Sequence, residues 1–431
     1  MIDGEEIYSF LKEIFPICRS ITGEGNRETL AKVREHIPIE IKEVPTGYTA
    51  YDWEVPLEWN IRDAYIKGPN GIKIANFKKN NLHVVNYSEA VNKKIPLEEL
   101  QKHLYSIPAL PSAIPYITSY YNRSWGFCIS DYQRNNLIDG EYEVYIDSSL
   151  EQGSMTYGEL IIPGESKEEI LLTTYICHPS MANNECSGIA VTTFLAKWLM
   201  SRDNKYTYRV VFAPETLGAI VYINKNYDEL RKNVIAGFNI TCVGDNNAYS
   251  FMPSREGGTL ADRIATHVLD NFVDEYETYS FLERGSDERQ YCHPSVDLPV
   301  VSIMRSKYGT YPEYHTSLDN LDFVSPEGLQ GAYNVTQKCF EALEMNGTYE
   351  NIAVCEPKMS KRGLHPKSWQ TRHLGSSNAE NLKKQVSDMM NTMVYCDGQR
   401  DLIELSNKIN LTYDECHQHL SRLEQHDVVT L

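Results

Sequence analysis

The chain has 431 residues, of which 42% are hydrophobic and 23% are charged, and its formal net charge is −18 at pH 7. This length exceeds one ordinary hydrophobic core, so we expect two or three domains. The negative charge disfavours nucleic acids and anionic membranes as main partners, because both would repel the chain.

The sequence carries no sign of export or of a membrane span. Its first residues, MIDGEEIYSF, lack the basic and apolar regions of a signal peptide. No run of about 18 apolar residues occurs, so we expect no transmembrane helix. The ten cysteines are scattered without a CxxC pair, which favours reduced thiols and a cytoplasmic location.

The first third of the chain is expected to form two helices, a strand and then a β-rich insertion. Apolar residues at helical spacing predict helices over residues 5–15 and 26–37, and alternation predicts a strand over 39–44. Residues 45–137 are dense in Trp, Tyr, Asn, Gly and Pro and carry short β-type runs, which indicates an inserted β-rich subdomain. Its aromatic residues either line a substrate-facing wall or pack in a core: Trp53, Trp59, Tyr120, Tyr121 and Trp125.

Residues 138–346 are expected to complete an α/β domain with residues 1–44. Strands are predicted over 140–146 and 158–162 and over four apolar runs, 170–177, 209–214, 234–243 and 298–304. Helices are predicted between them over 188–199, 222–231 and 260–272, and a last one over 326–345. This alternation predicts a mixed, mostly parallel sheet flanked by helices.

Residues 347–431 are expected to form a linker, over about 357–377, and a winged-helix domain. Helices are predicted over 381–395, from 397–399 onward and over 413–425, with an edge strand near 427–429. From Glu350 on, ten Lys and Arg stand against eleven Asp and Glu, a net charge of −1. A DNA-reading domain is normally basic, so we expect a protein partner or a homo-oligomer contact here rather than DNA.

Polar side chains follow each of the four apolar runs. The run 170–177 leads to His178 and to a loop with Asn183, Asn184 and Glu185, and the run 209–214 leads to Glu215. The run 234–243 leads to Asp245, and the loop after 298–304 reaches His315. The carboxyl ends of parallel strands meet at one sheet edge, where α/β proteins place their chemistry. An imidazole, carboxylates and amide oxygens together are typical metal ligands.

These motifs resemble those of the co-catalytic zinc aminopeptidases. The resemblance rests on CHPSMANNECSG, PETLG, CVGD, GSDERQYC and YPEYHTSLDN. It is closer still to bacterial aminopeptidase-like proteins that have an inserted β-rich domain and a C-terminal winged helix, and that are often associated with polysaccharide biosynthesis. The resemblance implies a zinc exopeptidase-like fold, with His178 and His315 as metal ligands and Glu215 as general base.

The chain departs from that family at four acidic positions. The metal-bridging Asp falls on Asn184, a second metal-ligand Glu on Thr216, the Asp of the second metal on Thr241, and the Asp that orients the first His on Ser180. A neutral Asn cannot bridge two cations as a carboxylate does, so we expect one Zn²⁺ rather than two. Glu185 is the preferred source of the missing ligand, and Asp245 is the alternative.

The remaining motif residues are candidates for substrate binding. By the resemblance, Asp287 or Glu288 would bind an amine and Arg289 a carboxylate; equally, the three could form a buried ion-pair cluster that fixes the loop. Tyr314 either donates a hydrogen bond to a tetrahedral oxyanion or packs against its neighbours. Asp319 is expected to orient His315.

The sequence therefore leads to a hypothesis and a rival. The hypothesis is a zinc-dependent hydrolase of aminopeptidase type, which cleaves an amide next to a free amine by metal-activated water with Glu215 as general base. Its substrate would be a small peptide or an aminoacyl or amino-sugar amide. The rival is a catalytically degenerate binding or scaffold protein, to which the four departures point.

Overall fold

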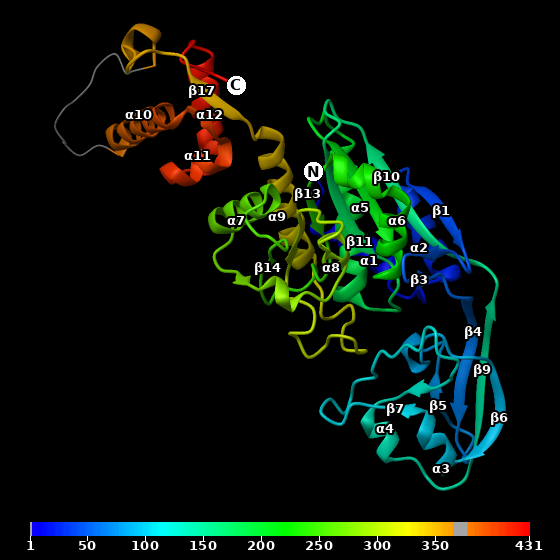
Figure 1. Cartoon of the computed structure of the whole chain (residues 1–431). Helices are drawn as coiled ribbons and strands as arrows, with labels where there is room; N and C mark the ends of the chain where they lie inside the picture. Colours follow the sequence, from blue (N-terminus) through cyan, green and yellow to red (C-terminus); the bar gives the residue numbers. More distant parts are fainter. Residues whose placement is uncertain (1, 365–376) are drawn as a thin grey trace. The chain divides into compact units, whose positions relative to one another are not determined.

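The structure, a computed structural model, describes residues 2–364 and 377–431 (Figure 1). It divides into two compact units, the first up to Asp262 plus Glu275–Asn334 and the second Arg263–Asp274 plus Val335–Leu431. Helices α7 (Leu260–Phe272) and α9 (Pro326–Met345) carry the chain between the units. Among the described residues, no helix combines the length and apolar character that crossing a membrane requires.

The first unit is built on a mixed eight-stranded sheet, which confirms the predicted fold class. Its centre, β12-β11-β13-β16, is parallel, and antiparallel neighbours flank it. In sheet order the strands are β1 (Glu40–Pro45), β10 (Ser154–Ile162), β12 (Thr207–Ala213), β11 (Glu169–Tyr175), β13 (Val234–Asn239), β16 (Val300–Met304), β14 (Ser250–Met252) and β15 (Glu277–Thr278). Every residue of β11 is buried, as expected of a central parallel strand covered on both faces.

Helix α5 (Ser187–Leu199) packs on β11 and is contacted by α1 (Gly4–Ile14) and α2 (Glu24–His36). It can approach the sheet closely because residue 188 is glycine: a Cβ there would lie 2.5 Å from the carbonyl oxygen of Ile240. Helix α6 (Leu217–Asn233) contacts β12, β13 and the short helix α8 (Glu288–Tyr291). The first turns of α5 and α6 therefore begin at the sheet edge where the candidate site lies.

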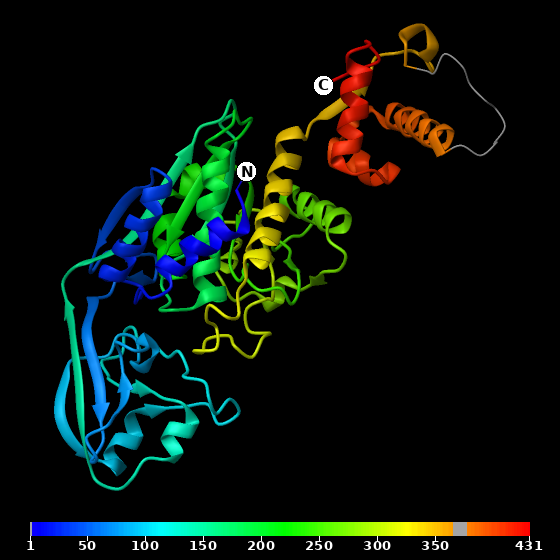
Figure 2. The same cartoon turned by 180° about the vertical axis from the view of Figure 1, so that it is seen from behind.

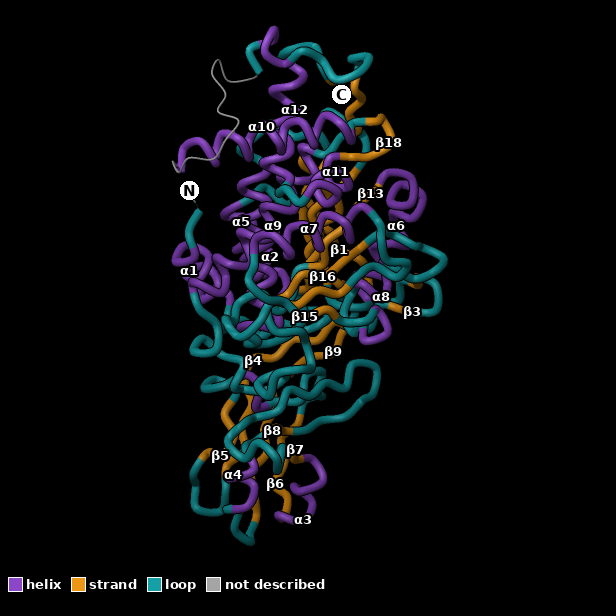
Figure 3. Tube along the Cα trace, turned by 90° about the vertical axis from the view of Figure 1, so that its left-hand side faces the viewer, coloured by secondary structure: helices purple, strands orange, loops and turns teal. Residues whose placement is uncertain are grey.

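The inserted segment contains its own four-stranded sheet, in the order β5-β4-β9-β6 (Figures 1 and 2). These strands are β4 (Glu58–Lys67), β5 (Lys73–Asn76), β6 (Val91–Pro96) and β9 (Glu141–Glu151). Two small pairs accompany them, β2 (Thr49–Ala50) with β3 (Trp53–Glu54) and β7 (Leu104–Tyr105) with β8 (Phe127–Cys128), as do helices α3 (Leu97–Leu100) and α4 (Asp131–Asn135). Loops make up much of the rest of the segment (Figure 3).

The strand predicted over 140–146 was assigned to the wrong sheet. As part of β9, it pairs antiparallel with β4 and β6 instead of entering the main sheet. Alternation along a strand indicates which side chains are buried, but it does not identify the neighbouring strand. The domain boundaries given above stay a prediction.

The second unit contains a three-stranded sheet and three helices, as a winged helix requires. The strands are β17 (Thr348–Asn351), β18 (Asp397–Asp401) and β19 (Val429–Thr430), in the order β18-β17-β19, and the helices are α10 (Ser377–Tyr395), α11 (Leu402–Ile409) and α12 (Tyr413–Glu424). The prediction of a helix from 397 was wrong, because these residues form β18 and α11 begins only after Asp401 caps it. The predicted linker falls largely on residues 365–376, outside the described residues.

A carboxylate at the start of β4 ties the inserted segment to the main domain. Arg27 donates to both oxygens of Glu58, at 2.8 and 2.7 Å, and the backbone N–H of Ser154 adds a third bond at 2.9 Å. The hydrogen bonds from Arg27, opposed by partial burial, lower the pKa of Glu58 to about 2. Since its pKa is below that of the unfolded chain, Glu58 stabilises the fold above about pH 4.3 and loses this effect as the pH falls towards 2.

We therefore expect Glu58→Gln to lower the free energy of unfolding at pH 7 by about 1–2 kcal/mol, and to flatten its dependence on pH between 4.5 and 2. Urea unfolding at several pH values measures both effects. Glu24→Gln is the control, since the side chain of Glu24 is 74% exposed although it also pairs with Arg27. Equal pH dependence of the wild type and Glu58→Gln would contradict this role.

Candidate metal centre and catalytic site

The loop after β11 enters α5 through one π-helical turn, Ala182–Cys186, all of whose residues are buried. Such turns are rare and often occur at functional sites. The carboxylate of Asp319 fixes this turn by accepting the backbone N–H groups of Asn183, at 2.6 Å, and of Asn184, at 2.9 Å. Asp319 was expected to orient His315. In the structure its carboxylate instead caps the π-helical turn that carries Asn183, Asn184 and Glu185.

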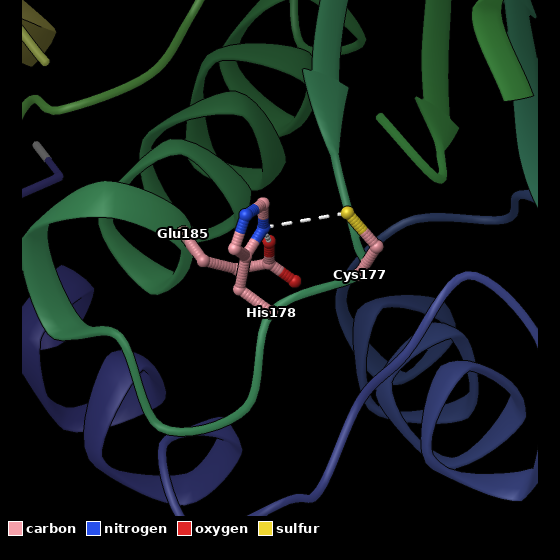
Figure 4. A group of neighbouring side chains, drawn as sticks. All are labelled: Cys177, His178 and Glu185. Atoms are coloured by element: carbon pink, nitrogen blue, oxygen red, sulfur yellow. Dashed lines mark hydrogen bonds and ion pairs between the residues drawn. The ribbon is translucent and has the colours of Figure 1, made fainter. Parts of the chain in front are cut away.

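Glu185, in that turn, holds His178 in one orientation. Its Oε2 lies 2.9 Å from Nδ1 of His178 (Figure 4). Its Oε1 accepts from Nε of Arg19, also at 2.9 Å. A carboxylate only accepts hydrogen bonds, so Nδ1 of His178 carries the proton and Nε2 is the atom presented to the site. Both Arg19 and Glu185 have fully buried side chains.

Arg19 has five hydrogen-bonding contacts in this buried position. Besides Glu185, it donates to the carbonyl oxygens of His178 and Ile14, at 3.0 and 2.7 Å, to Thr29 Oγ1 and to the sulfur of Cys186. Arg19 therefore secures both the backbone of His178 and the acid that orients its ring. A buried charge of this kind is tolerated only when it is paired and hydrogen-bonded.

Cys177, His178 and Glu185 are the described residues whose potential ligand atoms lie within 4.8 Å of one another (Figure 4). We do not assign a metal to this group, because both oxygens of Glu185 are hydrogen-bonded and the Arg19 guanidinium adjoins it. The structure thus places Glu185 behind the His178 ring, which is the position of an orienting acid. The sequence had assigned it as the preferred third ligand.

Asp245, the alternative ligand, is not brought to His178. Its two oxygens accept from Asn183 Nδ2 at 3.0 Å, from the N–H and hydroxyl of Ser306 at 3.0 and 2.7 Å, and from the N–H of Asn247 at 2.8 Å. Asp245 is fully buried and its acceptor capacity is used within the fold.

His178, Glu215 and His315 do come together. Nε2 of His178 lies 3.9 Å from Oε2 of Glu215, and the rings of His178 and His315 have centroids 5.1 Å apart. Nε2 of His315 is buried without a hydrogen-bond partner. Among the described residues, this atom and the similarly unpartnered Oδ1 of Asn184 are free to accept a ligand at the motif loops.

Burial and mutual charge set the protonation of these groups. Burial, reinforced by the charge of His178, lowers the pKa of His315 to about 3, so that ring is neutral at pH 7. Burial also lowers the pKa of His178, but the hydrogen bond to Glu185 and the negative charges of Glu185 and Glu215 together outweigh it, so the net shift is upward. Burial raises the pKa of Glu215, while His178 and Arg289 oppose that shift. A carboxyl with a raised pKa suits proton transfer near neutral pH.

The turn that presents Glu215 is strained and is held by the loop before α8. Thr216 has φ 63°, a left-handed conformation that is rare for a β-branched residue. Its backbone N–H donates to Asp287 at 2.7 Å, and its hydroxyl accepts from the guanidinium of Arg289. Burial and the charge of Glu215 raise the pKa of Asp287 well above its ordinary value.

Glu288 serves the loop rather than the site. Its carboxylate accepts from the backbone N–H groups of Gly285 and Ser286, from the Tyr308 hydroxyl and from the Asn239 amide, at 2.6–3.1 Å. The sequence left Asp287 and Glu288 open as the residue that binds a substrate amine. Because the oxygens of Glu288 are used within the fold, Asp287 is the candidate that remains.

Neutral groups stand at Asn184 and Thr241, where the resemblance implies acids for a second metal. Asn184 donates through Nδ2 to the Tyr175 hydroxyl at 2.7 Å, and that hydroxyl donates to the carbonyl oxygen of Asn184 at 2.8 Å. Thr241 donates to the same carbonyl at 3.1 Å and also contacts the Tyr175 hydroxyl. These three residues are hydrogen-bonded to one another, and only Oδ1 of Asn184 is left without a partner among them.

The inserted segment closes over the two histidines. Residues 115 and 316 form a β-bridge, and the N–H of Tyr116 donates to the carbonyl oxygen of His315 at 2.8 Å. The Tyr116 ring lies 5.1 Å from the His178 ring and meets the His315 ring edge-on at 5.2 Å. Tyr314 stacks on His315 with centroids 3.9 Å apart. The site is therefore built from both the main domain and the insertion.

Arg19, Tyr116 and Tyr175 were missed from the sequence. Arg19 precedes His178 by 159 positions and Tyr116 belongs to the insertion, so neither is close to the motifs along the chain. Only Tyr175 could have been found from the sequence. It ends a buried strand two residues before the motif, and a buried tyrosine hydroxyl usually has a hydrogen-bond partner, which here would come from the motif residues.

Comparison with known proteins assigns this architecture to a family. Residues 8–346 match the model described as "Domain of unknown function (DUF4910)", and residues 347–431 match a winged helix-turn-helix model. The chain belongs to the DUF4910 family. A relative in Clostridium acetobutylicum, named "Putative polysaccharide biosynthesis protein with aminopeptidase-like domain", is 48% identical over 363 residues, 84% of this chain and 83% of that protein.

Two solved structures share the fold of this chain. A crystal structure titled as a "putative peptidase" from Clostridium acetobutylicum is 42% identical, with a TM-score of 0.92 over 99% of this chain and 96% of that one. The zinc aminopeptidase BSAP from Bacillus subtilis has a TM-score of 0.56 at 12% identity, over 79% of this chain and 94% of that one, and so shares the fold. The resemblance to aminopeptidase-like proteins with a winged helix is confirmed.

We expect Arg19→Met to lower the free energy of unfolding by about 3–5 kcal/mol, because it leaves the buried Glu185 charge unpaired. The double variant Arg19→Met with Glu185→Gln removes both charges and should recover part of this loss. Urea unfolding of the wild type, Arg19→Met, Glu185→Gln and the double variant gives the coupling between the two residues. Stability of Arg19→Met equal to that of the wild type would contradict the pairing.

Proposed function

We propose that the protein is a zinc-dependent hydrolase of aminopeptidase type, which cleaves an amide next to a free amine. One observation carries the proposal: His178, oriented through Nδ1 by Glu185, presents Nε2 3.9 Å from Glu215 and has the His315 ring 5.1 Å away. An oriented imidazole and a second, buried imidazole beside a carboxylate with a raised pKa are the parts that metal-assisted hydrolysis needs.

The residues fit one ion and not two. Nε2 of His315 and Oδ1 of Asn184 are buried acceptors without a partner, and Nε2 of His178 faces the same region as Glu215. These nitrogen and oxygen atoms are of the kind that coordinate zinc, and they suit a single Zn²⁺. The acids of a second site are absent, and Tyr175, Asn184 and Thr241 are hydrogen-bonded to one another there.

When bound, zinc would supply Lewis acidity towards a substrate carbonyl and towards water. The other steps belong to the chain. Glu215 takes a proton from the attacking water and gives it to the leaving nitrogen, since it is the carboxylate nearest to His178 Nε2. Glu185 and Arg19 hold His178 still during this exchange, and His315 remains a neutral imidazole.

We further propose that the substrate is small: a short peptide, or an aminoacyl or amino-sugar amide. The segment around Tyr116 is hydrogen-bonded to the His315 loop and covers both histidines, which favours a short substrate. Asp287 remains the candidate for the amine and Arg289 for a carboxylate, while Tyr314 is the candidate donor to the oxyanion. The name of the relative suggests a link to polysaccharide biosynthesis. The cytoplasmic location and a protein or homo-oligomer partner of the winged helix stay predictions.

The alternative is a binding protein that has lost hydrolysis. Two observations favour it, both at positions where the resemblance to zinc aminopeptidases implies acids. Asn184 and Thr241 form a neutral hydrogen-bonded cluster with Tyr175, and the hydroxyl of Thr216 accepts from the guanidinium of Arg289. Metal content decides between the two proposals.

We expect about one zinc per chain by elemental analysis of protein purified with zinc, and loss of that zinc in His178→Ala and in His315→Ala. His293→Ala is the control, since His293 is exposed and outside the site. Two zinc ions per chain would contradict the single-ion site, and none would favour the binding protein.

We expect Glu215→Gln to retain zinc and the wild-type circular dichroism but to lower kcat about 10²–10⁴-fold on an aminoacyl amide that the wild type cleaves, because Gln cannot take a proton. A panel of aminoacyl anilides, short peptides and amino-sugar amides supplies the substrate. Full activity of Glu215→Gln would assign the base to another residue.

A further inference from the structure

A cavity of about 510 Å³ lies in the first unit, and neither His178 nor His315 is among its lining residues. Three groups of residues line it: the tip of the β2–β3 hairpin with Trp53, residues 220–227 of α6, and α8 with the segment that follows it. Its volume is in the range of small-molecule sites. The residues on which the argument depends are Tyr51, Asp52, Trp53, Tyr227, Gln290 and His293.

The hairpin exposes aromatic rings that the core does not need. Tyr51 is 56% exposed, Trp53 is 40% exposed, and Tyr121, which is 51% exposed, lies against Trp53 with centroids 6.4 Å apart. Tyr51 has φ 54° at the first position of the two-residue turn, where glycine or asparagine is strongly favoured. Neither the exposure nor the strained backbone stabilises the fold, which points to a ligand.

The walls of the cavity are fixed in place. The Tyr48 hydroxyl donates to Asn224 Oδ1 at 2.8 Å and so ties the hairpin to α6, and the Tyr121 hydroxyl donates to the carbonyl oxygen of Glu54 at 2.7 Å. On the opposite side, the Tyr227 hydroxyl donates to the carbonyl oxygen of Ser295 at 2.7 Å. A cavity held in this way needs little reordering when it binds.

The chemistry of the lining narrows the occupant. No Lys or Arg is among the lining residues, which disfavours phosphates and other anions. The guanidinium of Arg231 already lies over the Tyr227 ring, 5.5 Å from its centroid, and disfavours a second cation there. The lining therefore offers aromatic faces beside the hydrogen-bonding side chains of Asp52, Gln290 and His293. Such a surface suits a neutral sugar ring, whose C–H face stacks on an aromatic ring while its hydroxyls meet polar side chains.

We propose that this cavity binds a neutral pyranose unit of a glycan. Trp53 and Tyr51 supply the stacking surface, and Asp52, Gln290 and His293 bind the hydroxyls. The site adjoins elements that also serve the histidine centre, because Gln290 follows Arg289 and α6 begins directly after the Glu215–Thr216 turn. The proposal concerns binding alone and stands whether or not the protein hydrolyses an amide.

Saturation-transfer NMR on the full chain tests it. The probes are cellobiose, maltose, lactose and N,N′-diacetylchitobiose, with choline and the dipeptide amide Phe-Phe-NH₂ as competing classes. We expect transfer to the ring protons of at least one disaccharide, and calorimetry should then give its Kd. Transfer to choline or the dipeptide alone, or to none of the probes, would overturn the proposal.

Two variants locate the binding. Trp53→Ala should weaken the responding disaccharide about tenfold or more. Tyr51→Gly should also weaken it while the Tm stays equal or rises, since glycine adopts this conformation without strain. Tyr132→Ala is the matched control, because Tyr132 is 60% exposed on α4 and is not a lining residue. Unchanged affinity in both hairpin variants would place the sugar elsewhere and overturn the assignment.

Discussion

The buried pair of Arg19 and Glu185 is the constraint on which the site depends. Removing two charges from water is costly, and the cost is recovered only because Arg19 also bonds the backbone of His178 and of Ile14, while Glu185 bonds the ring of His178. The pair thereby connects the N-terminal segment, the end of β11 and the π-helical turn. By the resemblance to the zinc aminopeptidases, an Asp that orients the first His would stand at position 180, where this chain has Ser180. Here Glu185, in the π-helical turn, orients the His178 ring instead.

Charge also explains the rest of the centre. Where the zinc aminopeptidases resembled by the sequence hold acids for a second cation, this chain has Asn184 and Thr241, and the phenol of Tyr175 completes a neutral hydrogen-bonded group. Since neither position carries an acid, no buried carboxylate is left unpaired there, and the fold needs no cation to neutralise one. Oxygen and nitrogen acceptors remain at Asn184 and His315, and these are the atoms that an ion would satisfy.

Much of the fold followed from the sequence, for identifiable reasons. The four apolar runs became β11, β12, β13 and β16, because a short continuous apolar run bounded by polar loops is typical of a fully buried strand. Strand β9 was assigned to the wrong sheet, since pairing depends on a distant partner. Residues 397–401 form a strand although they precede a helix, because β17 offers a partner to pair with.

The sequence by itself determined the α/β class, the winged helix and the meeting of His178, Glu215 and His315, since residues at the carboxyl ends of parallel strands share one sheet edge. Only the tertiary structure decided what each of the other groups does. Glu185 orients rather than faces the site, Asp245 and Glu288 are used within the fold, and Tyr116 enters from the insertion. The physical reason is that a carboxylate's role depends on which donors reach its oxygens, and those donors, such as Arg19 and Ser306, come from parts of the chain that no local pattern connects.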